Sequence, residues 1–460
     1  MNWPLLLNSL LVGSLTTLLS GLLGFVAALT LAACEQRIRK LLLVAAIIAL
    51  VLPPFLVTNC WLELLGAEGT WQSWLPLNIY SLGGVVWLLT LLTWPLTTLL
   101  VLGAWCRLEA PQLEADSMVR GWSLIRGLLW PMARGAGGQA AVLTFVLALN
   151  NFAVPVILQV RVFPEELWLA FTTRLDEAGA WAASMPMIVA PALGLLLLRR
   201  TNVAWPNHDD ALNADVFRRQ LGKRWFLGCA LVAGALLLLA VVLPLQQLVV
   251  SSRTWAELPN LFRAAPDTIW NSFAFAAAAS SLCVVIGLVS WRLRLGLLLW
   301  LPFLVPGILL GRIMIAAFNG TVIYGTAAVV VLAFTLRYLS LAWTTITHAR
   351  AAMDHDVVDA ARLSGASGWP LFRRIVWPQI ASQVAAAWYV TYLLCLWDVE
   401  TLVLIYPPGG ETLALRIFNL LHYGHNAQVN ALCVTLLALA IAPLVVWSAW
   451  RWTQSKLAGQ

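Results

Sequence analysis

The sequence predicts an all-α polytopic membrane protein with about eleven transmembrane helices, arranged as two parallel five-helix repeats and one intervening helix. Of its 460 residues, 61% are hydrophobic and 11% are charged, and the mean hydropathy is +0.83. A soluble protein of this composition would expose large apolar patches to water. The composition therefore excludes a soluble enzyme, a disordered chain and a disulfide-stabilised scaffold.

Eleven apolar runs are long enough to cross a bilayer, which takes about 20 residues per helix. The first 34 residues carry no charged side chain, so we expect a retained first helix and not a cleaved signal peptide. The expected spans are residues 6–34, 41–64, 81–106, 136–160, 180–198, 226–247, 268–291, 295–318, 323–347, 381–405 and 429–450. Kinks are expected where prolines interrupt the second and eighth spans, at Pro53, Pro54, Pro302 and Pro306.

The distribution of Lys and Arg predicts an N-terminus outside and a C-terminus in the cytosol. If the segment after the first span is cytosolic, the cytosolic segments hold 21 of the 28 Lys and Arg residues, and the outer segments hold five. Such an excess is typical of cytosolic loops. We therefore expect a multi-pass protein of the inner (plasma) membrane, surrounded by lipid. The same asymmetry explains the net charge of +7 without nucleic acid as a partner.

An internal repeat organises the chain. Asn8-Ser9 and Asn271-Ser272 each open a long apolar run rich in small residues. At a constant spacing of 247 residues, Gly-Trp and Trp-Pro pairs recur in the same topological position, as Gly121, Trp122, Trp130 and Pro131, then Gly368, Trp369, Trp377 and Pro378. We expect a first repeat at residues 1–200, a cytosolic linker at 201–225, an intervening helix with an outer loop at 226–267, and a second repeat at 268–460. Two five-helix repeats in direct succession would have opposite orientations in the membrane. The extra helix between them gives the second repeat the same orientation as the first.

The second repeated loop predicts a short helix, a turn and another short helix on the cytosolic face. Asp356 is expected to cap the first helix, and Gly365 can end it in a left-handed conformation. Ser367 can cap the second helix, with Pro370 in its first turn, and Pro378 is expected to mark re-entry into the membrane.

This loop resembles the EAA loop of the permease subunits of binding-protein-dependent ABC importers. The family pattern is Glu-Ala-Ala, a glycine four residues later, and then Leu-Pro. The corresponding positions here are Asp359, Ala360, Ala361, Gly365, Trp377 and Pro378. With its internal duplication, the chain looks most like the fused permeases of the ferric-iron and thiamine type.

The resemblance implies a transport subunit that forms the solute pathway and is not an enzyme. The short cytosolic helix would dock on a separate cytosolic ATP-binding subunit, expected in two copies, while an extracytoplasmic solute-binding protein delivers the solute. The first loop departs further from the pattern, because Gln112-Leu113-Glu114 and Met118 occupy the acid-Ala-Ala and glycine positions. The sequence contains no phosphate-binding loop of its own and no metal-binding or cofactor signature.

Arg312, Arg337, Asp398 and Glu400 fall within the expected spans. Charged groups at membrane depth usually face a partner or water. Arg312 is expected at the depth of the two acids, so we expect it to pair with one of them. In the alternative interpretation the acids line the outer end of the pathway and favour a cation. Arg337 has no obvious partner in the sequence.

Two other functions remain open at this point. An ion-coupled secondary transporter with parallel repeats would need ionisable groups near the membrane midplane. It would have no reason to repeat a short cytosolic helix. A membrane enzyme is the weaker alternative, because the sequence shows no catalytic constellation.

Overall fold

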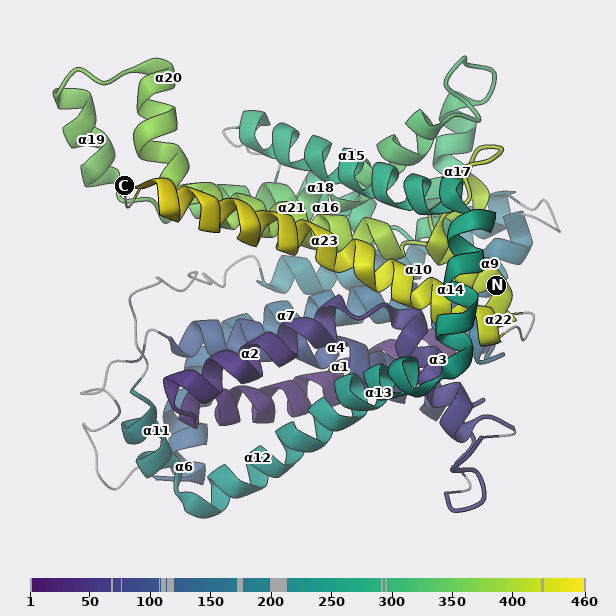
Figure 1. Ribbon diagram of the computed structural model, residues 1–460, viewed down its shortest axis with the longest axis horizontal. Helices are drawn as coiled ribbons and strands as arrows, with labels where there is room; N and C mark the ends of the chain where they lie inside the picture. Colours follow the sequence, from purple (N-terminus) through teal and green to yellow (C-terminus); the bar gives the residue numbers. More distant parts are fainter. Residues whose placement is uncertain are drawn as a thin grey trace. The chain divides into compact units, whose positions relative to one another are not determined.

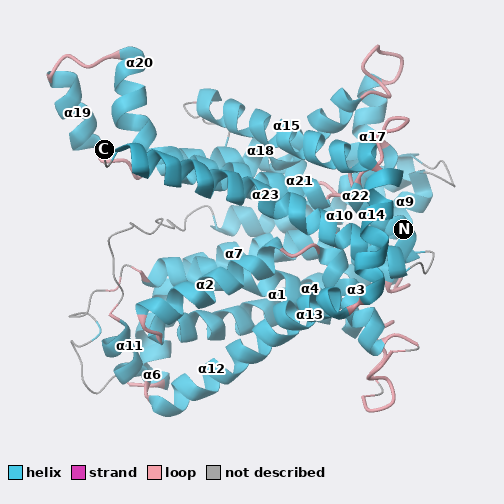
Figure 2. Cartoon of the chain, in the orientation of Figure 1, coloured by secondary structure: helices cyan, strands magenta, loops and turns pink. Residues whose placement is uncertain are grey.

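The computed structural model confirms an all-α polytopic membrane protein (Figures 1 and 2). It describes residues 2–458 except 68, 76, 107, 109–112, 114–119, 172–176, 199–212, 291–292, 294–295 and 423–425. Within that part of the chain no strand occurs, and nine helices are long and apolar enough to cross a membrane. Two further pairs of helices would raise the number to 11 if each bent pair forms one span.

The helices of the first half run from the N-terminus to the linker. They are α1 (Trp3–Ala33), α2 (Gln36–Val51), α3 (Pro54–Leu65), α4 (Leu82–Trp105), α6 (Trp122–Leu124), α7 (Trp130–Asn150), α8 (Ala153–Ile157), α9 (Phe163–Leu169) and α10 (Glu177–Leu198). A connecting series follows, with α11 (Ala214–Leu221), α12 (Lys223–Leu237), α13 (Leu243–Val250) and α14 (Ser252–Ala264).

The second half repeats this order of elements. It contains α15 (Pro266–Ser290), α16 (Gly296–Leu304), α17 (Gly307–Phe318), α18 (Ala327–Ala351), α19 (His355–Leu363), α20 (Gly368–Leu371), α21 (Trp377–Trp397), a 3₁₀ turn (Leu402–Leu404), α22 (Leu413–His422) and α23 (Asn426–Ala458). Three π-helical turns join neighbouring helices without a break, at Ile125–Leu129, Leu238–Val242 and Phe372–Val376.

The chain divides into two compact units. One comprises Met1–Phe262 with Ile417–Val434, and the other comprises Arg263–Arg416 with Thr435–Gln460. In the first unit, α1 packs against α4, α7 and α12, and in the second, α15 packs against α18 and α21. The predicted boundaries at residues 200, 225 and 267 stay predictions.

Sharp bends occur as expected at Pro53-Pro54 and at Pro306, whereas Pro302 lies inside α16 and not at the break. The axes of α2 and α3 meet at 88°, and those of α16 and α17 meet at 110°. Proline has no N–H for a helical hydrogen bond and pushes the preceding residue into an extended conformation. Leu52 before Pro53 accordingly has φ −61° and ψ 130°, and Pro306 at the second break has φ −51° and ψ 137°.

The expected spans at 136–160 and 381–405 begin and end too late. The helices start before the Trp-Pro pairs and run continuously over Trp122–Asn150 and Gly368–Trp397. A π-helical turn directly precedes each Trp-Pro pair, and its wider turn accommodates a proline without breaking the helix. The apolar residues after Asn150 and Trp397 form separate short elements, α8 and the 3₁₀ turn, so hydropathy alone placed the helix ends too far along the chain.

The repeat extends to backbone geometry at the spacing of 247 residues. Gly121 and Gly368 have φ of 57° and 58°. The π-helical turns and the helices α7 and α21 also coincide at this spacing. After these helices, Asn151 Oδ1 accepts a hydrogen bond from Val154 N (3.0 Å), and Asp398 Oδ1 accepts one from Thr401 N (2.9 Å).

The opening Asn-Ser pairs also make matching contacts. Ser9 Oγ accepts a hydrogen bond from Phe163 N (2.8 Å) at the start of α9, and Ser272 Oγ accepts one from Leu413 N (2.7 Å) at the start of α22. In the first half this bond joins α1 to the segment that follows α7. In the second half it joins α15 to the segment that follows α21. Both halves therefore use the same side chains for the same structural purpose.

Candidate functional site

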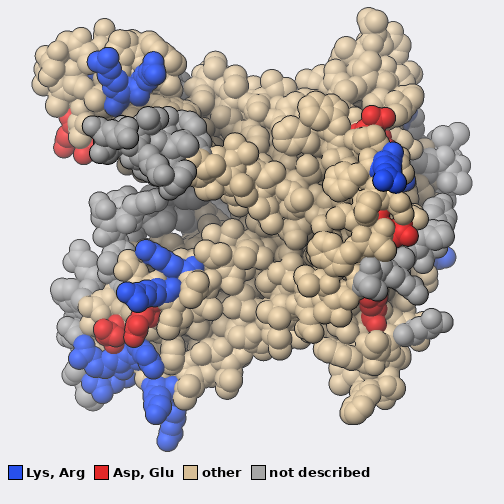
Figure 3. Space-filling model, viewed as in Figure 1, with Lys and Arg blue, Asp and Glu red and all other residues tan. Residues whose placement is uncertain are grey.

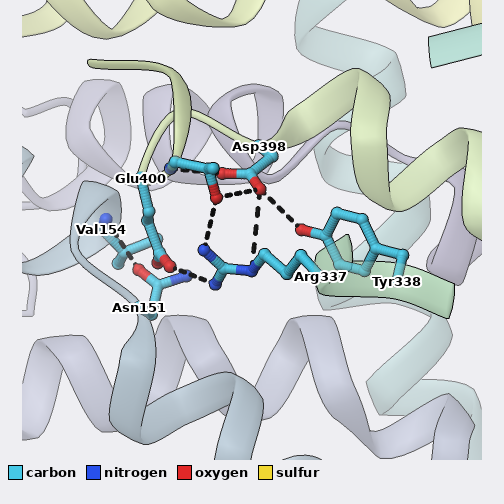
Figure 4. Close-up of polar contacts among 7 residues, drawn as sticks. Asn151, Val154, Arg337, Tyr338, Asp398 and Glu400 are labelled. Atoms are coloured by element: carbon cyan, nitrogen blue, oxygen red, sulfur yellow. Dashed lines mark hydrogen bonds and ion pairs between the residues drawn. The ribbon is translucent and has the colours of Figure 1, made fainter. Parts of the chain in front are cut away.

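A buried ionic cluster lies in the second unit, between α18 and the turn that follows α21. The Arg337 guanidinium donates to Glu400 Oε2 at 2.7 Å and to Thr401 Oγ1 at 2.6 Å, and its Nε lies 3.7 Å from Asp398 Oδ2. The Arg337 side chain is 8% exposed, and those of Asp398 and Glu400 are 0% and 13% exposed. Figure 4 shows the arginine between the two carboxylates.

Asp398 has a structural role in this cluster. It accepts hydrogen bonds from Thr401 N and Thr401 Oγ1 and from the Tyr338 hydroxyl, at 2.9, 2.7 and 2.9 Å. These contacts end α21 and fix the turn that follows it. Several hydrogen-bond donors and a neighbouring arginine offset the cost of burying the charge of this carboxylate.

Gly307, the first residue of α17, packs directly on this cluster. A Cβ atom there would lie 1.8 Å from the Arg337 Nη1 atom and 2.7 Å from the Glu400 Cβ atom. One turn later, a Cβ on Gly311 would lie 3.1 Å from the Thr401 carbonyl oxygen. The two glycines let α17 approach the turn closely, so the ionic cluster supports the bend between α16 and α17.

The sequence analysis named Arg337 but missed its partners, which are Glu400, Thr401 and Asp398. Arg312 lies in α17, and its expected pairing with Asp398 or Glu400 stays a prediction. In the first half, neutral residues stand at the spacing of 247, since Asn151 corresponds to Asp398, Ala153 to Glu400 and Val154 to Thr401. The acidic pair is therefore a feature of the second half only.

The second repeated loop forms an exposed helix, α19. Its N-cap is Asp354, two residues before the expected Asp356, and Asp354 Oδ1 accepts hydrogen bonds from the N–H groups of Asp356 (3.0 Å) and Val357 (3.3 Å). Gly365 ends the helix as expected, with φ 87°. Ser367 is the N-cap of α20, but α20 continues through the π-helical turn into α21. The expected second short helix is therefore the beginning of a membrane span.

The α19 helix buries little of its surface. Val358 is 4% exposed and packs in a cluster with Ile346, Val376 and Ile380. Val357, Leu363 and Trp369 are 45%, 91% and 68% exposed. Asp359 and Arg362 form an exposed ion pair at 3.0 Å, and Ala360 is exposed while Ala361 is half-buried. Val357 and Leu363 belong to α19, and Trp369 belongs to α20.

The described residues of the first repeated loop differ in exposure, because Leu113 is buried and Trp122 is 58% exposed. Gln112, Glu114 and Met118 lie outside the described residues. Leu113, which corresponds to Ala360, is 2% exposed and packs in a cluster with Phe217 and Leu221 of α11. Gly121 N donates to Gln220 O at 2.9 Å, and the Trp122 ring stacks on Trp225 with centroids 5.8 Å apart. The two loops therefore differ at this position, where Leu113 is buried and Ala360 is exposed.

Among the described residues, no group of three or more His, Cys, Asp or Glu side chains is placed to hold a metal ion.

The chain is similar to permease proteins of bacterial transport systems. It is 25% identical over 235 residues to proteins named PhnV, assigned to a 2-aminoethylphosphonate transport system, from Salmonella paratyphi A and Salmonella typhimurium. That alignment covers 46% of this chain and 89% of each relative. No family profile matches the chain.

A second relative is the spermidine/putrescine transport system permease protein PotC of Escherichia coli. It is 32% identical over 92 residues, which is 20% of this chain and 35% of PotC. These similarities and the helical architecture identify the chain as a multi-pass membrane protein related to transport-system permeases.

Proposed function

We propose that this chain is the transmembrane subunit of an ATP-driven, binding-protein-dependent importer in the inner (plasma) membrane. The observation that carries the proposal is α19, a short helix with its own N-cap and glycine stop, which exposes apolar side chains between two membrane spans. A solvent-exposed apolar surface of this kind favours a protein partner. ATP hydrolysis would take place in that partner, since the sequence has no phosphate-binding loop.

We further propose that one polypeptide carries two permease halves. An alignment that covers 89% of a PhnV protein takes up only 46% of this chain. The matched Gly-Trp, Trp-Pro and Asn-Ser contacts in both halves support the same interpretation. On this basis the chain is a fused permease like those of the ferric-iron and thiamine type, and each half would face one copy of the ATP-binding subunit.

Coupling to the ATP-binding partner would run mainly through the second loop. Val357 and Leu363 supply apolar contact area on α19, which also carries Asp359, Ala360 and Ala361, and Trp369 adds to it from α20. In the first loop Leu113, at the position of Ala360, is buried. Gly121, Trp122, Trp130 and Pro131 would then serve mainly to position the first loop and the start of α7.

Solute would pass by alternating access, after delivery by an extracytoplasmic binding protein. The relatives are named for 2-aminoethylphosphonate and for spermidine/putrescine, and these compounds are the first solutes to test in uptake measurements. An ion-coupled secondary transporter is the second candidate, and the buried acids Asp398 and Glu400 are the observation that favours it. Uptake that needs an ion gradient and no ATP would select that candidate.

The decisive experiment combines ATP-binding-subunit pull-down with solute uptake for Gly365→Val. The left-handed conformation strains a β-branched residue, so the end of α19 should shift and both signals should fall. Gly320→Val is the matched control, because Gly320 has φ 83° and open space around its Cβ position but lies in the loop between α17 and α18. Wild-type pull-down and uptake for Gly365→Val would rule out the coupling role of α19.

A further inference from the structure

The corner between α11 and α12 combines a basic surface with an apolar one, and we propose that it binds an anionic phospholipid. Residues 214–226 contain four basic side chains and one acidic side chain, Asp215. The four basic side chains are exposed, and they are Arg218, Arg219, Lys223 and Arg224. Figure 3 shows Lys and Arg gathered over α11 and the start of α12. This surface carries the charge that attracts an anionic headgroup.

The basic side chains stand on a fixed backbone. Phe217 and Leu221 of α11 are fully buried, and Gly222 turns the chain directly into α12 with φ 84°. The Arg218 guanidinium lies 4.5 Å from the centre of the Phe226 ring, across that turn. The first loop is tied to the same corner through the Gly121–Gln220 hydrogen bond. A headgroup at this position would meet a preorganised group of cations.

The apolar part of the surface begins one turn along α12. One face of this helix packs on α1 and is buried at Cys229, Ala233 and Leu236. The other face is exposed, with Leu227 at 50% and Leu231 at 75%. Because α12 belongs to a membrane-spanning segment, Lys223–Val250, this exposed face meets acyl chains in the bilayer.

The basic part and the apolar part of this surface together favour a phospholipid over a free phosphate ion. A phospholipid can place its phosphate on Lys223 and Arg224 and its acyl chains along Leu227 and Leu231, whereas inorganic phosphate would use only the basic part. Trp225, 44% exposed and stacked on Trp122, lies between the two parts, where aromatic side chains commonly meet the headgroup region. The proposal does not depend on how transport is driven.

The test titrates the purified full chain in detergent with phosphatidylglycerol, phosphatidylcholine or inorganic phosphate, and follows thermal stability and lipid retention by native mass spectrometry. We expect phosphatidylglycerol to be retained and to stabilise the protein more than phosphatidylcholine does. Replacing Lys223→Gln together with Arg224→Gln should weaken phosphatidylglycerol binding at least about tenfold, because each basic group contributes to headgroup attraction. High salt should reduce the wild-type preference.

The matched control is the double variant Arg373→Gln with Arg374→Gln, an exposed adjacent pair before α21, which should bind phosphatidylglycerol like the wild type. Equal binding of phosphatidylcholine, equal stabilisation by inorganic phosphate, or wild-type lipid affinity in the Lys223/Arg224 variant would each overturn the proposal. Loss of the ATP-binding partner with unchanged lipid affinity would assign the surface to a protein instead. If the double variant does not fold, competition between the two lipids for the wild type decides the question.

Discussion

At the scale of single residues, Arg337 holds two acids that would otherwise be buried together. Removing one member of a buried ionic group leaves an uncompensated charge, which costs about 3–5 kcal/mol. Arg337→Gln should therefore lower the thermal stability of the purified protein strongly. Arg362→Gln is the matched control, because its pair with Asp359 is exposed and such pairs contribute about 0–1 kcal/mol. A similar small loss for both variants would show that the cluster is not a stabilising centre.

The two glycines of α17 provide a graded test of the same packing. Gly307→Ala would place a methyl group on the Arg337 guanidinium and should destabilise the protein by about 1–3 kcal/mol. Gly311→Ala meets the Thr401 carbonyl oxygen at 3.1 Å and should cost less. Gly21→Ala in α1, with nothing within 4 Å of the new methyl group, is the control. Equal melting temperatures for all three variants would contradict the close approach of α17.

The residue scale is also where prediction from sequence was least complete. The sequence placed Asp398 and Glu400 within a span and predicted that Arg312 pairs with one of them, which stays a prediction, but it did not predict their contacts with Arg337. Those contacts were missed because the assumed helix over 381–405 placed the acids inside a span. The helix in fact ends at Trp397, and the acids lie in the following turn beside Arg337. Contacts between segments about 60 residues apart depend on such helix ends, which hydropathy does not determine.

At the scale of elements, α19 is stabilised mainly by its own caps. Asp354→Ala removes the acceptor of two backbone N–H groups and should cost the helix about 1 kcal/mol. Hydrogen exchange over residues 355–363 should then increase, while global melting stays nearly unchanged. Asp356→Ala, at the position first expected as the cap, should have the smaller effect. Faster exchange in the Asp356 variant than in the Asp354 variant would contradict the observed capping.

The bounds of several helices could be predicted from the sequence. The spans over α1, α4 and α12–α13 were predicted within a few residues, because their apolar runs end at polar or charged residues. The left-handed stop at Gly365 was also predicted, since few other residues adopt φ near 87°. The continuous helices through Trp130-Pro131 and Trp377-Pro378 were missed, because the π-helical turn that accommodates each proline has no signature in composition.

At the scale of the whole molecule, the membrane topology makes a direct prediction. Asn319 and Ser364 are separated by one long span, α18, so they should lie on opposite sides of the membrane. In a chain with its native cysteines replaced, Asn319→Cys should react with an impermeant thiol reagent in intact cells. Ser364→Cys should react only after the cells are permeabilised, because the excess of Lys and Arg predicts a cytosolic second loop. Reaction of both cysteines from outside would contradict this topology.

The neutral turn at Asn151 and the acidic turn at Asp398 have a consequence for how the protein can evolve. In a symmetric dimer of identical permeases, every substitution appears in both subunits at once. A chain that carries two halves in one gene is free of that constraint. The ionic cluster around Arg337 could therefore arise in one half while the other kept an uncharged turn. Under the proposed two-half organisation, covalent duplication lets selection act on each half separately, and the neutral turn at Asn151 and the acidic turn at Asp398 are the difference expected from it.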